Sequence, residues 1–293
     1  MRHNRIGMEF VRELHVGPES EVNVYRVDGV MVAIKLYKVT YLARNEQNVT
    51  SYLRERGIQG VIETYPTGIM RGVASKYYAN GELYAYVDAE HGLGAATCRH
   101  IFRRLAATLD ALHAAGVAHR DLKMENLLVD DDMEVVIGDF GLASQDGLFD
   151  RVCGTEAYMA PEIRRLMRCR QKGEGEEGGP CLWASDVWSL GCVLFVMYHG
   201  NFPTTAGVND WFSRCIANED WAQFWASHGP RAEQMPNEMK LVVQRCLCAD
   251  PARRATTTAL LADPWLGQGT GDAGEAEAYR TEMRRVRALF APV

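Results

Sequence analysis

The pattern of apolar and polar positions predicts β-strands at the start of the chain. Residues 8–16, 22–27 and 31–37 are short runs rich in the β-branched side chains that strands favour. Asp28-Gly29 separates the second run from the third, and an Asp-Gly pair in this position is a strong signal for a hairpin turn. The chain is therefore expected to begin with an antiparallel sheet, with further short strands up to about Tyr78.

Helical periodicity follows the predicted sheet. Residues 41–56 carry a narrow apolar stripe and are stopped by Gly57, so they are expected to form a helix. Residues 95–115 form a clearer helical pattern that Gly116 ends. The apolar residues of this second pattern are Ile101, Leu105, Leu109 and Leu112. From Trp183 onward the chain reads as helical again.

These elements predict an α+β fold in two lobes: a small antiparallel sheet with one helix, and a larger helical lobe. The expected boundaries are residues 1–78 for the first lobe, 79–267 for the second and 268–293 for a C-terminal tail. Residues 170–180 are rich in Gly and Glu, and are expected to form a surface insertion. The tail begins as a Gly-rich linker and continues as an Arg-rich helix. A packed or solvated terminal helix and a regulatory or docking segment both stay open for it.

Composition limits the classes of protein to which the chain can belong. Hydrophobic residues make up 47% of 293 residues, and the net charge of −6 argues against general affinity for nucleic acid or acidic membranes. The 8 cysteines show no regular framework and are expected to be free thiols in a reducing compartment. The N-terminus has no apolar signal core, and the apolar stretch 187–198 is too short to span a bilayer. We expect an intracellular, soluble protein of the cytoplasm, with the nucleus as an alternative.

Three short segments carry side chains suited to phosphoryl transfer, which needs a cation for phosphates, oxygen ligands for a metal and a carboxylate near the nucleophile. Residues 119–126, His-Arg-Asp-Leu-Lys-Met-Glu-Asn, supply a carboxylate, an ammonium and a carboxamide on one turn. Residues 139–141, Asp-Phe-Gly, supply a second carboxylate at a turn that glycine makes permissive. Lys35 lies in an otherwise apolar strand, where an ammonium needs an anionic partner or a bound phosphate.

Together with Ala160-Pro161-Glu162, these segments resemble the ordered signature set of the eukaryotic-type protein kinase family: strand lysine, catalytic loop, D-F-G and A-P-E. Residues 186–191 and 250–254 extend the resemblance, which covers about residues 8–267. The ending 263–266, Asp-Pro-Trp-Leu, loosely resembles the calcium/calmodulin-dependent kinase group. The resemblance implies the bilobal protein kinase fold and a Ser/Thr protein kinase. Such an enzyme transfers the γ-phosphoryl group of ATP, its co-substrate, to protein hydroxyls with Mg²⁺ or Mn²⁺.

The resemblance also implies catalytic roles for the matching residues. Asp121 is expected to act as the catalytic base that orients the substrate hydroxyl and accepts its proton. Lys123 is expected to neutralise the transferred phosphoryl group, and Thr155 to line the substrate site beside them. Asn126 and Asp139 are expected to hold the metal through oxygen, the ligand atom that Mg²⁺ prefers.

Lys35 is expected to bind the α- and β-phosphates, with Glu46 or Glu55 of the following helix as its partner. Glu46 is favoured because Val49 and Leu53 then face the core, although its spacing from Lys35 is short for the family. The other ATP-binding residues that the resemblance implies are Val16, Gly17, Val22, Ala33, Ser75, Lys76, Tyr78, Glu82 and Leu128. Residues with a structural role are expected to be Arg120, Phe140, Glu162, Asp186 and Arg254.

The phosphate-covering loop departs from the family pattern of three spaced glycines. Only Gly17 remains, and Glu19 and Glu21 would repel a polyphosphate. Weaker nucleotide affinity or a nonstandard loop shape is therefore expected. In the connector between the lobes, Ser75 would leave the back of the adenine pocket open to bulky inhibitors. The main chain of residues 76–78 is expected to hydrogen-bond the adenine.

The segment after Asp-Phe-Gly also departs from the family pattern. Many kinases carry a phosphorylatable residue two positions before Cys-Gly-Thr, where this chain has Arg151. Arg120 is therefore expected to pair with a carboxylate, either Asp146 or Asp150, rather than with a phosphate. Ser144 is the only Ser or Thr of this segment before Thr155. Activity independent of phosphorylation of the segment is expected.

The expected partner is a protein or peptide substrate. Lys123 indicates Ser/Thr rather than tyrosine, and residues 160–162 disfavour a small-molecule substrate. Glu82 and Glu125 match positions that hold an arginine N-terminal to the target in basophilic kinases, although Glu82 could equally bind the ribose. We expect a monomer without nucleic-acid or membrane partners. The degenerate loop keeps an alternative open: a nucleotide-binding pseudokinase scaffold with weak or no turnover.

Overall fold

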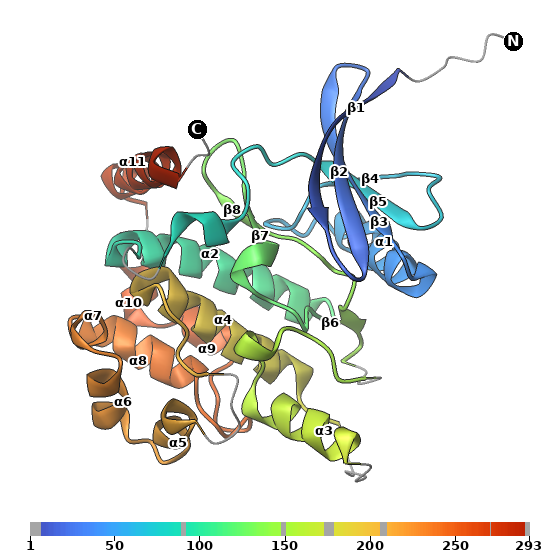
Figure 1. The fold of residues 1–293 in the computed structure, drawn as a ribbon. Helices are drawn as coiled ribbons and strands as arrows, with labels where there is room; N and C mark the ends of the chain where they lie inside the picture. The colour runs from blue at the N-terminus through green and yellow to red at the C-terminus, as the bar shows by residue number, and fades with distance from the viewer. Residues whose placement is uncertain are drawn as a thin grey trace, which may run out of the picture.

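The computed structural model describes residues 7–88, 92–147, 151–172, 179–205, 210–269 and 271–290. A five-stranded antiparallel sheet and one helix form the smaller lobe, and a larger lobe holds the remaining helices (Figure 1). This bilobal α+β arrangement confirms the fold expected from the sequence. Most of the expected insertion at 170–180 falls on residues 173–178, which lie outside the described residues.

The smaller lobe follows the predicted strands closely. Its elements are β1 (Met8–Val16), β2 (Ser20–Val27), β3 (Val30–Tyr37), α1 (Thr40–Glu55), β4 (Thr64–Tyr65) and β5 (Gly72–Lys76). The strand order is β1-β2-β3-β5-β4. The turn between β2 and β3 is formed by Asp28 and Gly29, with φ angles of 48° and 86°. Positive φ at both central residues is the requirement of a type I′ turn, which explains the Asp-Gly signal.

The larger lobe is mainly helical. Its helices are η1 (Leu83–Tyr86), α2 (Ala95–Ala114), η2 (Met124–Asn126), η3 (Glu156–Tyr158), α3 (Pro161–Gln171), α4 (Leu182–His199), α5 (Trp211–Ala217), α6 (Trp221–Ser227), α7 (Pro230–Glu233), α8 (Asn237–Cys246), α9 (Thr257–Leu261), α10 (Pro264–Gly267) and α11 (Ala273–Phe290). Two small sheets pair β6 (Val117–Ala118) with β9 (Ser144–Gln145), and β7 (Leu127–Val129) with β8 (Val135–Ile137). The catalytic segments expected from the sequence lie on the turns that join these short strands.

Helix α4 forms the centre of the larger lobe and is buried on nearly all sides. Trp188, Leu190 and Phe195 are each at most 1% exposed. A helix that is apolar all round is typical of a protein core, and α4 packs against α2 and α8. Among the helices in the described part of the chain, none combines the length and the apolar character needed to cross a membrane.

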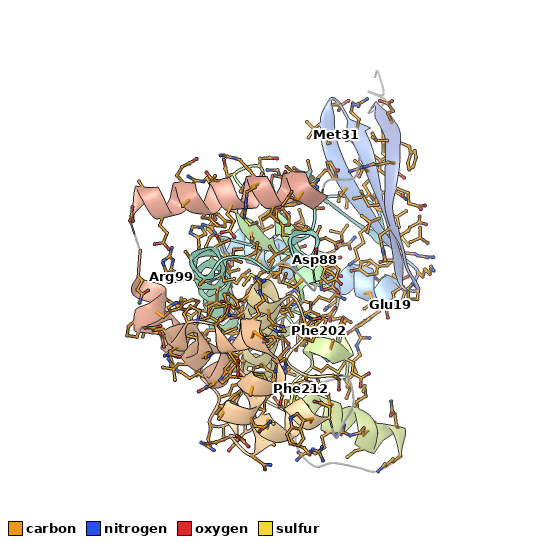
Figure 2. The ribbon with its side chains drawn as sticks, turned by 60° about the vertical axis from the view of Figure 1, so that its left-hand side comes forward. Glu19, Met31, Asp88, Arg99, Phe202 and Phe212 are labelled. Atoms are coloured by element: carbon orange, nitrogen blue, oxygen red, sulfur yellow. The ribbon has the colours of Figure 1, made fainter. Side chains whose placement is uncertain are left out.

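Helix α11 packs against α2 and η1 on the outside of the larger lobe, and Figure 2 shows Arg99 of α2 beneath it. Tyr279 and Met283 are at most 2% exposed, and the ring of Tyr279 stacks on that of His100 at 3.9 Å. Arg99 also forms an ion pair of 2.9 Å with Glu275. The described part of the tail is therefore a helix packed on the larger lobe.

Replacing Met283 with Ala is expected to lower the free energy of unfolding by about 2–5 kcal/mol, because the fully buried side chain leaves a cavity. Leu289 on the same helix is 71% exposed, so Leu289→Ala is the matched control and should change stability little. Urea denaturation of the three proteins measures the difference. Equal effects of the two substitutions would show that α11 does not dock on the lobe in solution.

Candidate active site

The catalytic loop is fixed by a buried carboxylate from the central helix. Asp186 of α4 is 1% exposed and accepts hydrogen bonds of 2.8 Å from the main-chain N–H groups of His119 and Arg120. Its Oδ2 atom also lies 3.0 Å from Nε2 of His113. Arg120 has a φ of 69°, a conformation that non-glycine residues adopt only when their surroundings impose it. The two hydrogen bonds to Asp186 supply this constraint.

The side chains of Asp121, Lys123 and Thr155 lie together at the end of this loop. Asp121 Oδ1 accepts hydrogen bonds from the main-chain N–H of Thr155 at 2.7 Å and from its hydroxyl at 2.8 Å. The Lys123 ammonium lies 3.2 Å from Asp121 Oδ2 and donates to the Thr155 hydroxyl at 2.9 Å. Gly154 permits this approach, because its φ is 109° and an added Cβ would lie 2.6 Å from a carbonyl of the loop. A carboxylate, a cation and a hydroxyl thus share one small polar site.

A second charged cluster joins the smaller lobe to the Asp-Phe-Gly turn. The Lys35 ammonium lies 2.6 Å from Asp139 Oδ1 and 3.9 Å from Glu46 Oε2. Glu46 is 3% exposed and its Oε1 atom accepts the main-chain N–H of Phe140 at 3.3 Å. Of the two carboxylates considered as partners of Lys35, the structure brings Glu46 to the lysine. Glu55, at the end of α1, instead accepts a hydrogen bond from Ser51 at 3.3 Å.

Burial and mutual charge set the protonation of this cluster. Burial alone would raise the pKa of Asp139, but the charge and hydrogen bond of Lys35, with smaller contributions from His119 and Gly141, outweigh it and hold the pKa below its usual value. Burial would lower the pKa of Lys35, but the Glu46 and Asp139 carboxylates outweigh it and raise the pKa. Asp139 is therefore a carboxylate and Lys35 an ammonium at neutral pH, which suits oxygen and phosphate ligands respectively.

Two residues of this cluster were not identified from the sequence. Tyr37 is 4% exposed, and its hydroxyl donates to Glu46 Oε2 at 2.7 Å. Asn45 Nδ2 donates to the carbonyl oxygens of Gly141 at 3.0 Å and Ala143 at 2.9 Å. The available signal for Tyr37 was its spacing, because residues i and i+2 of a strand lie on the same face and Tyr37 follows Lys35 by two positions. The available signal for Asn45 was its position next to Glu46 in the sequence.

The residues expected to hold a metal offer suitable oxygen atoms. Asn126 is buried, and its Nδ2 donates to the main-chain carbonyl of Asp121 at 2.8 Å. Because Nδ2 donates this hydrogen bond, the carboxamide is oriented so that Oδ1 is the atom that can coordinate a metal ion. The ionised Asp139 supplies a second hard oxygen donor. This pair fits a cation such as Mg²⁺, which is bound by few protein carboxylates and amides together with substrate phosphates.

The residues expected around the adenine lie on β2, β3, β5 and β7. Ala33 is paired with Ser75, and both are buried, while Val22 is paired with Lys35. Leu128 forms an isolated bridge with Glu82. Burial, followed by the charge of Glu125, raises the pKa of Glu82.

At the end of β5 and in the connector after it, Lys76 and Tyr78, both expected to contact adenine, make other contacts. The main-chain N–H of Lys76 donates to the carbonyl of Glu63 at 2.9 Å, and the side chain of Lys76 pairs with Asp131 at 2.8 Å. The hydroxyl of Tyr78 accepts the main-chain N–H of Glu63 at 3.1 Å. The Lys76 N–H is therefore engaged in the sheet-rich lobe.

The expected phosphate-covering loop is a tight hairpin turn. Val16 ends β1 with 57% exposure, and the N–H of Gly17 donates to the carbonyl of Ser20 at 2.9 Å. Lys38, which follows β3, holds the turn in place through two hydrogen bonds. Its ammonium donates to the carbonyl oxygen of Gly17 at 2.8 Å, and its main-chain N–H donates to the carbonyl oxygen of Glu19 at 2.8 Å. Figure 2 shows Glu19 at the end of the sheet that is nearer the larger lobe. Lys38 therefore holds the turn, and this residue is not part of the family's pattern of three glycines.

Arg120 of the catalytic loop contacts the segment after Asp-Phe-Gly. Its guanidinium donates to the main-chain carbonyl of Arg151. Asp150 itself lies outside the described residues. The guanidinium of Arg151 in turn lies over the ring of Tyr41 on α1, 4.7 Å from its centre.

A buried ion pair ties the Ala-Pro-Glu segment to the larger lobe. Arg254 donates to the two carboxylate oxygens of Glu162 at 2.7 and 3.0 Å. The same guanidinium donates to the carbonyls of Ala184 at 2.7 Å and Cys248 at 2.9 Å, and lies over the ring of Trp188. The structure thus joins two of the residues for which a structural role was expected.

Comparisons with known proteins agree with this fold, which is that of a eukaryotic-type protein kinase. The family model described as the protein kinase domain matches residues 12–266, and the chain belongs to the protein kinase family. CBL-interacting protein kinase 16 of Oryza sativa subsp. japonica is 33% identical over 261 residues, which cover 82% of this chain and 52% of that protein.

Two further relatives have similar coverage of the chain. NUAK family SNF1-like kinase 1 of Homo sapiens is 28% identical over 83% of this chain and 36% of its own length. Calcium/calmodulin-dependent protein kinase type 1 of Caenorhabditis briggsae is 29% identical over 84% of this chain and 64% of its own length. The chain spans about half the length of the CBL-interacting kinases that it matches.

Replacing Arg254 with Met is expected to lower the free energy of unfolding by about 3–5 kcal/mol, because it leaves the Glu162 carboxylate buried without its partner. The neighbouring Arg253 pairs with Glu219 at the surface, so Arg253→Met is the matched control and should have little effect. Chemical denaturation at one pH and salt concentration compares the variants. A loss at Arg254 no larger than that at Arg253 would contradict the structural role of the buried pair.

Proposed function

We propose that this protein kinase phosphorylates Ser and Thr hydroxyls of proteins, with Asp121 as the catalytic base. The observation that carries the proposal is the cluster of Asp121, Lys123 and Thr155 within 3.2 Å of one another. The Asp121 carboxylate is placed to accept a hydrogen bond from an incoming hydroxyl and then its proton. The Lys123 ammonium compensates the negative charge of the transferred phosphoryl group.

ATP is the co-substrate in this proposal. Lys35 binds the α- and β-phosphates, and Glu46 orients it. Asn126 Oδ1 and the Asp139 carboxylate hold the divalent cation, which bridges the phosphates and neutralises their charge when bound. Lys35 pairs with Asp139 in the structure, so the phosphates and the cation compete with this ion pair when they bind.

The adenine lies between the two lobes in this proposal. It is enclosed by Val22, Ala33 and Leu128, and the carbonyl of Lys76 and the N–H of Tyr78 hydrogen-bond its edge. The small side chain of Ser75 leaves room behind the base for bulky inhibitors. Val16 and Gly17 cover the phosphates through the hairpin turn. We further propose residues 1–78 and 79–267 as the two lobes and 268–293 as the tail.

Substrate preference follows from the charges near the catalytic cluster. Burial raises the pKa of Glu82, and the charge of Glu125 raises it further. A guanidinium between the two carboxylates would relieve their repulsion and form strong charge-assisted hydrogen bonds. An arginine N-terminal to the target Ser or Thr is therefore the proposed preference.

The test is phosphate transfer from labelled ATP to an arrayed peptide library with Mg²⁺ or Mn²⁺. Asp139→Asn is expected to reduce the signal on the order of 100-fold or more. The divalent cation then loses a charged ligand, and the negative charge of the transferred phosphoryl group is no longer compensated. The matched control is Asp132→Asn, at an exposed position in the turn between β7 and β8. Chelation of the divalent cation should abolish transfer by the wild type.

A second function competes with this proposal because Glu19 and Glu21 oppose phosphate binding. In that alternative the chain binds nucleotide as a pseudokinase scaffold with weak or no turnover. Folded wild-type protein that shifts its melting temperature with ATP, but transfers no phosphate to any peptide, would support the scaffold and reject the enzyme. Enrichment of arginine before the phosphorylated residue would support the proposed peptide preference.

We also propose that the kinase is active without phosphorylation of the segment after Asp-Phe-Gly. Ser144 is 7% exposed and pairs with Ala118 in a strand, which makes it a poor acceptor for another kinase. Arg120 and Arg151 instead connect the catalytic loop, the segment and α1 through a main-chain hydrogen bond and the stacking of Arg151 on Tyr41. These contacts replace the bridging that a phosphate would provide.

Phosphatase-treated enzyme and Ser144→Ala are therefore expected to retain wild-type kcat/KM. Arg151→Gln should lower kcat/KM about fivefold, because it removes the cation–π contact that joins the segment to α1. Arg214 lies over the ring of Trp211 on α5, so Arg214→Gln removes a similar contact far from the site and serves as the control. Abolition of activity by phosphatase or by Ser144→Ala would overturn the proposal.

A further inference from the structure

Tyr37 occupies a buried position beside three functional elements. It ends β3, two residues after Lys35, and only 4% of its surface is exposed. The Lys35 ammonium lies 4.6 Å from the centre of its ring. The apolar part of Tyr37 packs with Leu42, Ala43 and Val73 in a small cluster of the sheet-rich lobe. The ring is therefore held in place by packing that does not depend on the hydroxyl.

The hydroxyl of Tyr37 points into the charged cluster. It lies 2.7 Å from Glu46 Oε2 and 3.4 Å from Asp139 Oδ1. A phenol has one proton to donate, and the shorter distance assigns that proton to Glu46. The Lys35 ammonium is 3.9 Å from the same oxygen, beyond hydrogen-bonding distance. Tyr37 is thus the nearer donor to the carboxylate that is expected to orient Lys35.

The same hydroxyl also contacts the Asp-Phe-Gly turn. A Cβ added to Gly141 would lie 2.5 Å from the Tyr37 oxygen, so the hydroxyl fills the space that a side chain would need there. Glu46 accepts the N–H of Phe140 with its other oxygen, at 3.3 Å. Tyr37 and Glu46 therefore link β3, α1 and the turn through two hydrogen bonds and one close packing contact.

We propose that Tyr37 is a positioning residue for ATP, whose hydroxyl holds the Glu46 carboxylate beside Lys35 and the Asp-Phe-Gly turn. When phosphates and cation draw Lys35 away from Asp139, Lys35 must be oriented by Glu46 alone. With the Tyr37 hydroxyl as a fixed donor, the buried Glu46 carboxylate keeps its orientation during this change. Without that hydroxyl, the carboxylate must rotate to find another hydrogen-bond donor. The proposal rests on the function proposed above and assigns to Tyr37 an effect on nucleotide rather than on peptide.

Tyr37→Phe tests this role because it removes the hydroxyl and keeps the packed ring. The KM for ATP and the Kd for ATP with Mg²⁺ are expected to rise about tenfold, since a hydrogen bond to a charged group is lost. The KM for peptide is expected to stay unchanged. The matched control is Tyr52→Phe, which removes a hydroxyl that donates to the Ala115 carbonyl at 2.9 Å from the other side of α1. It should leave both ATP constants unchanged.

A double-mutant cycle identifies the partner through which Tyr37 acts. If the hydroxyl works through the carboxylate, Tyr37→Phe combined with Glu46→Gln should raise the Kd for ATP no further than Glu46→Gln alone. Additive effects, or a Kd for ATP in Tyr37→Phe equal to that of the wild type, would overturn the proposal. If Tyr37→Phe changed only the melting temperature, Tyr37 would contribute to packing alone, and the positioning role would be rejected.

The Kd measurement separates this inference from the proposed function. If the wild type transfers no phosphate, the proposed enzyme fails, yet ATP titration followed by intrinsic fluorescence still measures the effect of Tyr37→Phe on nucleotide binding. If the wild type is active and the Kd does not move in Tyr37→Phe, the enzyme stands and the inference about Tyr37 is wrong. Should Tyr37→Phe fail to fold, Glu46→Gln alone tests the same hydrogen bond from the acceptor side, and a Kd for ATP equal to that of the wild type would reject the positioning role.

Discussion

The buried carboxylate of Asp186 is the constraint on which the active site depends. Its helix, α4, lies at the centre of the larger lobe, so the charge has no access to water. A buried carboxylate must be compensated by hydrogen-bond donors, and the catalytic loop supplies them from the main chain of His119 and Arg120. The core thereby determines the path of the loop. The left-handed φ of Arg120 and the position of Asp121 next to it both follow from this single requirement.

Side chains of the smaller lobe connect that lobe to the Asp-Phe-Gly turn of the larger lobe. Lys35, Glu46 and Asp139 come from β3, α1 and the turn after β8, and their charges compensate one another. Glu46 is buried, whereas Lys35 and Asp139 are partly exposed. Asn45 adds hydrogen bonds to the carbonyls of the same turn. Because each charge is balanced only when the lobes are in register, the cluster favours one relative placement of strand, helix and turn.

Much of the architecture could be predicted from the sequence, because it depends on local patterns. Strands β1 to β3, helices α1 and α2 and the Asp28-Gly29 turn follow from periodicity and turn chemistry, and the ordered motifs point to Lys35 and Asp121. Contacts between distant segments could not be predicted in this way. The docking of α11, the acceptor of Arg120 and the hydroxyl of Tyr37 each depend on how separate elements pack, which no local pattern encodes.

Helix α11 has a consequence for the boundaries chosen when the kinase is produced. The family match ends at residue 266, whereas Tyr279, Met283 and Val286 cover part of α2 and η1 beyond that point. Arg287 reaches the carbonyl of Ala79, in the connector between the lobes, at 3.3 Å. A recombinant protein trimmed to the matched family range would uncover this apolar strip and tend to self-associate. The functional unit for crystallisation or assay therefore includes the tail helix.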